Sequence, residues 1–165
     1  MNQNDTYGIL GQFAPKCEIK DWINEEGQFD NSVQIENYKG KVVVLFCFQD
    51  WCQGCHSIGF PALQRMTDAL GRNEEIVFLA IQTVFEGHSV NTFDKLVENQ
   101  KKYQLKIPFG QDNGDTTTQG VSKIMHQYRT GGTPWFIVIN QDGIVIFNDF
   151  HINTKKAIAI LETLN

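Results

Sequence analysis

Residues 42–48 carry the pattern that most constrains the fold. Val42 to Phe48 is an uninterrupted apolar run of mainly β-branched and aromatic residues, and such a run predicts a central strand covered on both faces. A helix is predicted directly after it, because apolar residues recur at helical spacing and Gly71 stands where a helix would stop. These apolar positions are Ile58, Ala62, Leu63, Met66, Ala69 and Leu70. A second buried-type strand follows at Ile76 to Ile81, so the three elements together predict a parallel βαβ unit.

The rest of the chain continues this alternation of helices and strands. A helix is predicted from Asn91 and ends before Ile107-Pro108, because the residue before a proline disfavours the helical region. A short strand is predicted at Lys106 to Gly110, and a helix follows it, with Val121, Ile124, Met125 and Tyr128 on one face and its end at Gly131-Gly132. Trp135 to Ile139 and Ile144 to Phe147 are predicted to form an antiparallel hairpin around the turn Asn140 to Gly143. The last predicted helix has four residues facing inward, which are Ala157, Ile158, Leu161 and Leu164.

Length and composition predict one domain over residues 1–165. The chain of 165 residues lies in the range of about 100 to 200 that is typical of one domain, and 41% of its residues are hydrophobic. A net charge of -5, with the acids spread along the chain, indicates no surface for nucleic acid or an anionic membrane. No apolar run reaches the roughly 18 residues that span a bilayer, and Met1 to Asp5 are polar. As written, the chain is expected to be cytoplasmic, or exported if a signal peptide had been removed from it.

Two cysteines lie where the first strand meets the first helix. Trp51-Cys52-Gln53-Gly54-Cys55 places Cys52 at the carboxyl end of a strand and at the start of a helix. Unpaired amide groups and the positive end of the helix dipole stabilise a thiolate there, so Cys52 is expected to have a lowered pKa and to be the exposed nucleophile. Cys55, one helical turn further, is expected to resolve a mixed disulfide on Cys52.

Thr133-Pro134 is a second candidate element, just before the strand that begins at Trp135. A proline there cannot donate to a strand ladder, and a cis peptide bond would expose the preceding backbone to an extended substrate. The sequence does not decide whether the bond is cis.

Several segments, in this order, resemble the thioredoxin superfamily. They are Gly40-Lys41, Val42 to Phe48, Trp51 to Cys55, Pro61-Ala62-Leu63 and Gly132-Thr133-Pro134. Phe13-Ala14-Pro15 and a helix-strand insertion at about residues 84–110 are more similar to its TlpA/ResA and AhpC/TSA (redoxin) branch. The resemblance covers roughly Gly11 to Leu164. It implies an α/β thioredoxin-like fold, with a central mixed β-sheet flanked by helices, an N-terminal extension and that insertion.

For the site, the resemblance implies that Cys52 attacks and Cys55 resolves, with a cis Pro134 facing them and Thr133 tuning the redox potential. The chain departs from the thioredoxin pattern at three places. The strand Val42 to Phe48 contains no acid, so the proton acceptor for Cys55 is unassigned, and Gln53-Gly54 stands where thioredoxin has Gly-Pro. Pro61 comes one residue late, with Gly59 nearby, which predicts a kink or bulge in that helix.

Two alternatives compete with a redox pair. Cys52, Cys55 and His56 also match the C-x-x-C-H pattern of haem attachment, so a non-enzymatic haem- or metal-binding module is possible, although no second Cys or His pair completes a zinc site. A peroxiredoxin-like thiol peroxidase would need a threonine three residues before its nucleophile, where this chain has Gln49. We therefore expect no metal and no cofactor beyond the cysteine pair.

Four polar residues near the cysteines are candidate modulators. His56 could lower the pKa of the thiolate or shuttle a proton, but a surface histidine on the first helical turn is the preferred interpretation. Glu86 and His88 follow the second strand, where a solvated polar loop is the commoner explanation. Asp50 could raise the pKa of Cys52 or cap the helix, and both interpretations stay open.

Other cysteines and aromatic residues receive simpler interpretations. Cys47 is expected to be a small packed thiol and Cys17 an unpaired thiol. Trp51, Trp135 and Phe60 are candidates for an exposed apolar collar around the site, with Trp51 the best placed because it precedes Cys52.

The sequence thus predicts a thiol-disulfide oxidoreductase that exchanges a Cys52-Cys55 disulfide or dithiol with its substrate. The expected partners are a disulfide-containing protein or small thiol and a recycling reductant, with no nucleic acid and no membrane, and we expect a monomer. In a cytoplasmic setting the net reaction would be reduction.

Overall fold

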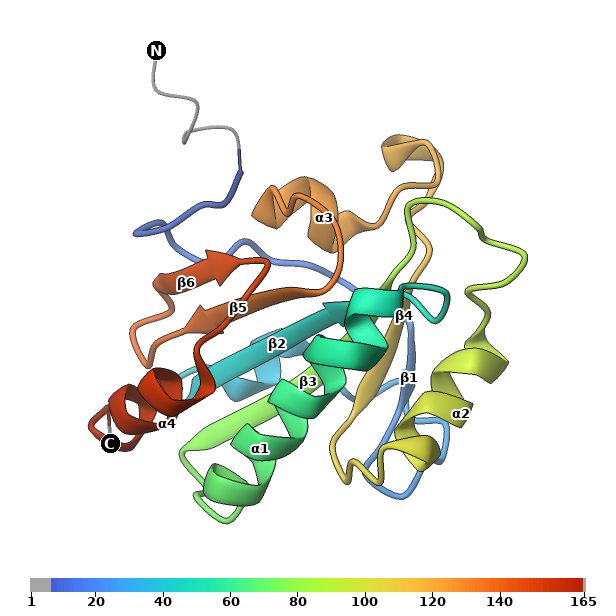
Figure 1. The fold of residues 1–165 in the computed structure, drawn as a ribbon. Coiled ribbons are helices and arrows are strands. Elements are labelled where there is room, and N and C mark those ends of the chain that lie inside the picture. The colour runs from blue at the N-terminus through green and yellow to red at the C-terminus, as the bar shows by residue number, and fades with distance from the viewer. Residues whose placement is uncertain (1–6, 165) are drawn as a thin grey trace.

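A mixed sheet of six strands, in the order β1-β4-β3-β2-β5-β6, organises the computed structural model of the chain (Figure 1). The structure describes residues 7–164, so Met1 to Asp5, on which the expectation about export depends, lie outside the described residues. The strands are β1 (Asp21–Ile23), β2 (Val42–Phe48), β3 (Ile76–Thr83), β4 (Phe109–Asp112), β5 (Trp135–Ile139) and β6 (Val145–Asp149). The α-helices are α1 (Phe60–Leu70), α2 (Phe93–Lys102), α3 (Lys123–Tyr128) and α4 (Thr154–Glu162). None of these helices is long and apolar enough to cross a membrane.

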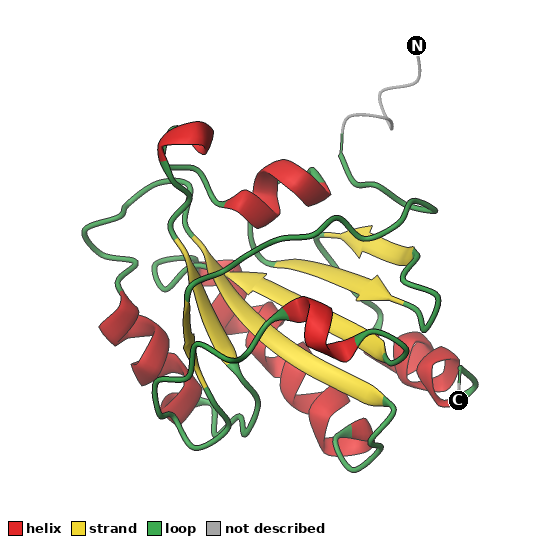
Figure 2. Cartoon of the chain, turned by 180° about the vertical axis from the view of Figure 1, so that it is seen from behind, coloured by secondary structure: helices red, strands yellow, loops and turns green. Residues whose placement is uncertain are grey.

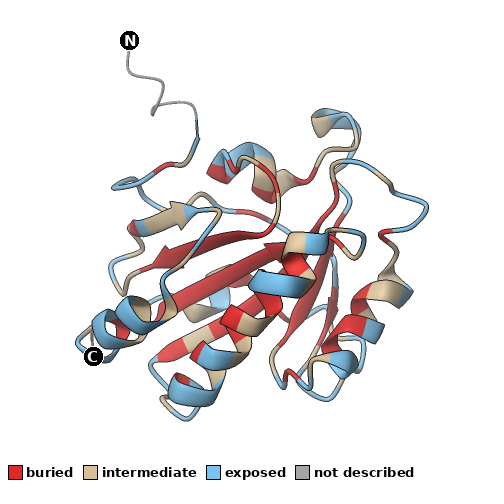
Figure 3. Cartoon of the chain, in the orientation of Figure 1, coloured by how far each residue is buried: buried red, intermediate tan, exposed pale blue. Residues whose placement is uncertain are grey.

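β2 lies at the centre of the sheet, as its apolar sequence predicts. It pairs in parallel with β3, with Phe48 opposite Gln82, and antiparallel with β5, with Phe46 opposite Phe136. All seven residues of β2 are buried, because helices or loop segments cover both faces of the sheet (Figure 3). The predicted parallel βαβ unit and the mixed sheet are therefore confirmed.

Two apolar clusters fill the space on the two faces of the sheet. One cluster takes Leu63 from α1, Leu96 from α2 and Leu161 from α4. The other takes Ile124 from α3 together with residues of the N-terminal segment, which lies on the face of the sheet that Figure 2 turns toward the viewer. Alternate residues of β2 point to each cluster, which explains why no polar residue occurs in the run.

Several predicted boundaries shift. β4 begins at Phe109 rather than at Lys106, and α3 begins at Lys123, where the side chain of Ser122 caps it. α3 ends at Tyr128, before the glycine pair, because the next residue, Arg129, adopts the left-handed conformation. The hairpin of β5 and β6 is confirmed, with a bulge next to Ile139. Sequence analysis missed β1, because three residues at a sheet edge are too few to show a period.

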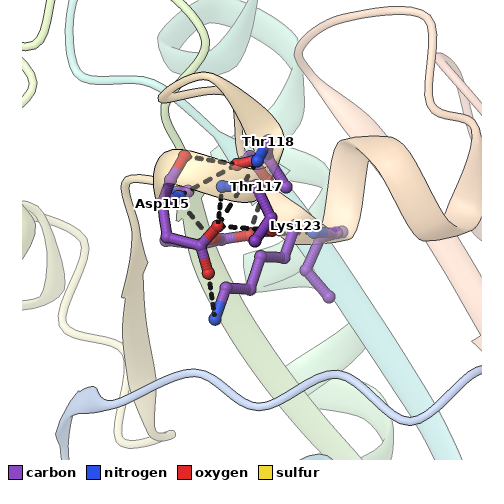
Figure 4. A network of polar contacts seen from close by, with 8 residues as sticks. Asp115, Thr117, Thr118 and Lys123 are labelled. Atoms are coloured by element: carbon purple, nitrogen blue, oxygen red, sulfur yellow. Dashed lines mark hydrogen bonds and ion pairs between the residues drawn. The ribbon is translucent and has the colours of Figure 1, made fainter.

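A network of polar contacts occupies the turn between β4 and α3 (Figure 4). The carboxylate of Asp115 accepts the amide hydrogens of Thr117 and Thr118, and the Thr118 hydroxyl accepts the Asp115 amide hydrogen, which completes a capping box. Lys123 Nζ lies 3.0 Å from Asp115 Oδ2. A hydrogen bond from the Thr117 hydroxyl, first of all, and then those from Lys123 and the Thr117 amide lower the pKa of Asp115. We assign this cluster a structural role.

A π-helical turn, Cys55–Gly59, precedes α1 and confirms the predicted bulge. Gly59 lies at the tightest contact in this turn. A Cβ there would lie 2.8 Å from Phe46 Cε2 and Cζ and 2.9 Å from Pro134 Cβ. The absence of a side chain therefore lets the turn pack directly against β2 and the segment before β5.

Candidate active site

Cys52 and Cys55 lie between the carboxyl end of β2 and the start of α1. Cys52 is partly exposed, whereas Cys55 is fully buried and begins the π-helical turn. The Cys55 amide donates to Cys52 Sγ at 3.2 Å, and Cys52 Sγ lies 3.5 Å from the Thr133 carbonyl oxygen, to which it donates when it is protonated. Both cysteines are free thiols in this structure. The outer sulfur is thus accessible, and the inner one lies behind it.

The environment shifts the pKa values of the two thiols in opposite directions. A hydrogen bond from the Cys55 thiol lowers the pKa of Cys52 from 9.0 to about 6 against the opposing effect of burial, with smaller contributions from Thr133, the Cys55 amide and the charge of His56. Burial, first of all, and then the Cys52 sulfur raise the pKa of Cys55 well above its ordinary range. At neutral pH the pair therefore holds one thiolate, on Cys52, which accepts a hydrogen bond from its protonated partner. This agrees with the lowered pKa that the sequence predicts for Cys52.

The Thr133-Pro134 peptide bond is cis, as the resemblance implies. The segment faces the cysteines directly, since a Cβ on Gly54 would lie 3.3 Å from Pro134 Cδ. The Thr133 carbonyl therefore lies beside Cys52, and the proline ring lies against the turn between the two cysteines.

Trp51 forms the exposed apolar surface next to Cys52. Its side chain is 49% exposed, and its ring lies over Gly87, where a Cβ would be 3.0 Å from two ring carbons. The prediction that Trp135 and Phe60 share this surface is wrong. Trp135 is buried against Phe150 on the opposite face of the sheet, and Phe60 is buried because it faces the sheet from the first turn of α1.

His56 is not a surface histidine, so the preferred sequence interpretation is wrong. It is partly buried, and its ring bridges two groups: Nε2 lies 2.5 Å from the Asp50 carbonyl oxygen, and Nδ1 lies 2.5 Å from the Tyr103 hydroxyl. The charge of the ring also contributes to lowering the pKa of Cys52. The sequence places His56 beside Cys55 but gives no sign of its partner on α2, which lies 47 residues further along the chain.

Asp50 follows neither of the two open interpretations. No side chain caps the π-helical turn or α1, and Asp50 is not among the groups that shift the pKa of Cys52. Its carboxylate instead accepts a hydrogen bond of 2.9 Å from Asn99 Nδ2 on α2, and its amide donates to Gln82 Oε1 at 2.9 Å. Asp50 therefore connects the active-site loop to α2 and β3.

Glu86 and His88 lie in an exposed loop after β3, consistent with a solvated polar loop. His88 Nε2 donates to the Gly120 carbonyl at 2.7 Å, and the Glu86 carbonyl accepts from Asn91 Nδ2 at 3.1 Å. Within residues 7–164, neither side chain has a recorded hydrogen bond to the cysteine pair.

Sequence analysis missed a group of buried amide side chains beneath the active-site loop. Gln49, Gln82 and Gln111 lie at the carboxyl ends of β2, β3 and β4, and Gln82 Nε2 donates to Gln111 Oε1 at 2.8 Å. Asn91 accepts the Trp51 amide hydrogen at 3.2 Å, and Gln49 accepts the amide hydrogen of Phe85 at 3.2 Å. Amides at the ends of three neighbouring parallel strands are the signal that could have revealed this network.

The geometry does not favour either alternative chemistry. Both ring nitrogens of His56 already have partners, and Cys55 is buried, so neither is disposed to hold a metal or haem group. No group of three or more His, Cys, Asp or Glu side chains within residues 7–164 is placed to hold a metal ion. Gln49, at the position where the peroxidase pattern has threonine, is buried and its side-chain oxygen accepts the Phe85 amide hydrogen.

Comparison with solved structures finds the same fold in redox proteins. A thioredoxin-like superfamily protein is 27% identical with a TM-score of 0.80, over 92% of this chain and 95% of that chain. A thiol-disulfide isomerase from Corynebacterium glutamicum is 24% identical with a TM-score of 0.78, over 93% and 96%. A reduced 2-Cys peroxiredoxin from Plasmodium vivax is 17% identical with a TM-score of 0.68, over 93% and 80%.

The sequence itself matches the AhpC/TSA family over residues 10–148. A search of curated proteins finds no match. The family match spans most of the chain, and the solved neighbours share its thioredoxin-like α/β fold. The chain therefore belongs to the AhpC/TSA family and is an oxidoreductase of the thioredoxin superfamily.

Proposed function

We propose that this protein is a thiol-disulfide oxidoreductase in which Cys52 and Cys55 exchange a disulfide with a protein or small-thiol substrate. The observation that carries the proposal is the placement of the two thiols, because Cys52 is partly exposed and Cys55 is buried directly behind it, with its amide 3.2 Å from Cys52 Sγ. The opposite shifts of their pKa values, down for Cys52 and up for Cys55, support it. One thiol is accessible and ionised, and the other is buried, protonated and directed at the first sulfur. This is the division of roles that a two-step exchange requires.

In the first step, the Cys52 thiolate attacks one sulfur of the substrate disulfide. A bond forms between Cys52 Sγ and that sulfur, the substrate disulfide breaks, and the other substrate sulfur leaves as a thiolate. In the second step, Cys55 loses its proton and attacks Cys52 Sγ, which releases the second substrate thiolate. The substrate gains two electrons, and Cys52 and Cys55 are oxidised to a disulfide.

The first step itself prepares Cys55 for the second. In the free dithiol, the Cys52 sulfur raises the pKa of Cys55 through both its hydrogen bond and its charge. Once Cys52 is in a mixed disulfide its charge is gone, so these two effects weaken and only burial still opposes ionisation. The departing substrate thiolate is a base that can take the Cys55 proton, which would explain why β2 needs no acid.

The surroundings of Cys52 favour a substrate with an apolar group next to its disulfide. Trp51 presents an exposed ring beside Cys52, and the Thr133 carbonyl offers a backbone acceptor on the other side. In a reducing compartment such as the cytoplasm, the pair would act as a reductant and would need a recycling thiol or reductase.

Trapping of mixed disulfides tests the proposal. Cys55→Ser leaves the nucleophile but removes the resolving thiol, so it should accumulate mixed disulfides with a model disulfide peptide, detected by mass spectrometry. Cys52→Ser is the matched control and should accumulate none, because the three remaining thiols are buried and burial raises the pKa of each. The same amount of adduct in both variants, or none in Cys55→Ser, would contradict the proposal.

A further inference from the structure

The helix-strand insertion contributes two side chains to the active-site loop. Asn99 lies within α2 and Tyr103 follows its last residue, so the two are four residues apart and project from the same face of the helix. Asn99 Nδ2 donates to the Asp50 carboxylate, and the Tyr103 hydroxyl lies 2.5 Å from His56 Nδ1. α2 therefore contacts the segment that holds the cysteines both before Cys52 and after Cys55.

Hydrogen-bond chemistry fixes how the His56 ring is used. The Asp50 carbonyl can only accept, so Nε2 carries a hydrogen and donates to it. In the neutral ring Nδ1 must then accept from the Tyr103 hydroxyl, and in the protonated ring Nδ1 donates to the same oxygen. Both states of the ring keep both partners, so the bridge does not depend on whether the ring is charged.

Tyr103 is itself held rigidly. Its ring stacks on Phe60 with centroids 4.1 Å apart and an interplanar angle of 9°, and its backbone carbonyl accepts from Gln64 Nε2 at 2.9 Å. Both partners belong to α1, which lies next to α2 on the same face of the sheet (Figure 1). The hydroxyl that meets His56 is thus fixed by two helices.

We propose that His56, held between the Asp50 carbonyl and the Tyr103 hydroxyl, is a positioning residue of the thiol exchange. Asp50 and His56 flank the Cys52-Cys55 segment on its two sides, so the hydrogen bond between them closes the segment into a ring. That ring directs the Cys55 amide at Cys52 Sγ, which it meets at 3.2 Å. The inference assigns to the insertion, through Tyr103, a part in the exchange that Cys52 and Cys55 perform.

The groups facing the His56 ring define the electrostatics of the test. Tyr103 faces it from the end of α2, with Lys102 Nζ 5.2 Å from the Tyr103 ring centroid. Asp50 directs its backbone carbonyl, and not its carboxylate, at the His56 ring. The charge of that ring contributes to lowering the pKa of Cys52. The residue of α1 that faces the His56 ring is Phe60, which is apolar. The thiolate of Cys52 is therefore the group whose titration reports a change at His56.

The pH dependence of Cys52 alkylation by iodoacetamide tests this positioning role. His56→Ala should raise the midpoint pH by about 0.5 to 1 unit, which corresponds to the threefold to tenfold ratio that one net hydrogen bond provides. The alkylation rate below the midpoint should fall by less than this ratio, because nucleophilicity rises with pKa. Tyr103→Phe, which removes one oxygen and is the variant safer for folding, should shift the midpoint in the same direction by less. His56→Gln should recover most of the loss, because its amide can donate to the Asp50 carbonyl.

Matched controls come from residues remote from the site. His126→Ala removes an exposed histidine of α3, and Tyr38→Phe removes a hydroxyl group just before the first residue of β2, at the end of that strand away from the cysteines. Neither change should move the alkylation midpoint of Cys52. Wild-type midpoints in both His56→Ala and Tyr103→Phe would overturn the inference. An equal shift of the alkylation midpoint in His56→Gln and His56→Ala would also overturn the inference, because loss of the His56 charge alone would then explain the shift.

This inference rests on the proposed function, but the two fail in different ways. Absence of mixed disulfides in Cys55→Ser would remove the function and leave these alkylation midpoints unaffected, since iodoacetamide needs no exchange partner. A loss of folding alone would lower the urea midpoint of unfolding without changing the pH profile of the folded protein.

Discussion

Cys52 should react as a thiolate far below the pH at which an ordinary cysteine does. With a pKa of about 6, Cys52 is roughly 90% ionised at pH 7, against about 1% for a thiol with a pKa of 9.0. The rate gain is smaller than this ratio, because intrinsic nucleophilicity falls with pKa with a slope of about 0.4 to 0.5. Over about three pKa units that slope lowers the rate roughly twentyfold, which leaves a net acceleration of about fourfold at pH 7.

The same reasoning predicts a larger advantage at lower pH. Near pH 5.5, an ordinary thiol is almost wholly protonated while Cys52 is still about one quarter ionised, so the net acceleration rises to about thirtyfold or more. The profile of rate against pH should thus have its midpoint near 6 and a plateau above about pH 7.

Alkylation of the reduced protein, followed by peptide mass, is the assay. Cys17 and Cys47 serve as internal controls, because both are buried and burial, more than any other cause, raises the pKa of each. They should stay unlabelled while Cys52 reacts, and Cys52→Ser should lose the fast phase. A Cys52 midpoint near 9, or labelling of Cys17 at a comparable rate, would refute the structural explanation of the lowered pKa.

Three further predictions concern stability. Gly59→Ala should destabilise the protein by about 2 kcal/mol, because the new Cβ would overlap a buried ring, whereas Gly54→Ala, with its nearest contact at 3.3 Å, should change the urea midpoint little. Asn91→Ala should cost about 1 to 3 kcal/mol, because the buried Asn91 side chain accepts the Trp51 amide hydrogen and donates to the Glu86 carbonyl; a shift of less than about 1 kcal/mol would contradict this role. For the reduced protein, the pKa of Cys52 is lower in the folded than in the unfolded state, so this group's stabilisation is complete above about pH 9 and is lost as the pH falls through about 6. The urea midpoint relative to Cys52→Ser should therefore rise with pH across this window, and a parallel dependence in the two proteins would refute it.

Much of the architecture could be predicted from local patterns. The apolar run of β2, the helical spacing of α1 and the turn between β5 and β6 each depend on neighbours in the chain, and each was predicted with the correct type. The late Pro61 and the nearby Gly59 also predicted the irregular turn before α1. Boundaries were less accurate, because a hydrogen-bonded cap such as Ser122 at α3 decides where a helix begins.

The errors at the site have a common physical cause, which is that contacts between distant segments decide exposure. Phe60 follows the cysteines closely in sequence and Trp135 directly follows Pro134, but both side chains pack into the core, Phe60 on the face of the sheet that α1 covers and Trp135 on the other face. His56 is polar and lies early in a helical segment, which is typical of a surface residue, yet Tyr103 and the Asp50 carbonyl enclose it. Nothing local in the sequence reports these partners.

The sequence by itself determined the order of the elements, the position of Cys52 and Cys55 between a buried strand and a helix, and the proline that faces them. The first two follow from hydrophobic periodicity and residue spacing, which are local properties of the chain, and the facing proline is what the resemblance to the thioredoxin superfamily implies. The sequence also predicted that Cys52 is the exposed thiol, but only the tertiary structure decided why the two pKa values separate, because burial and hydrogen bonding depend on packing across β2, β5 and α1. It also decided that α2 supports the active-site loop, because Asn99 and Tyr103 reach Asp50 and His56 only after the chain has folded.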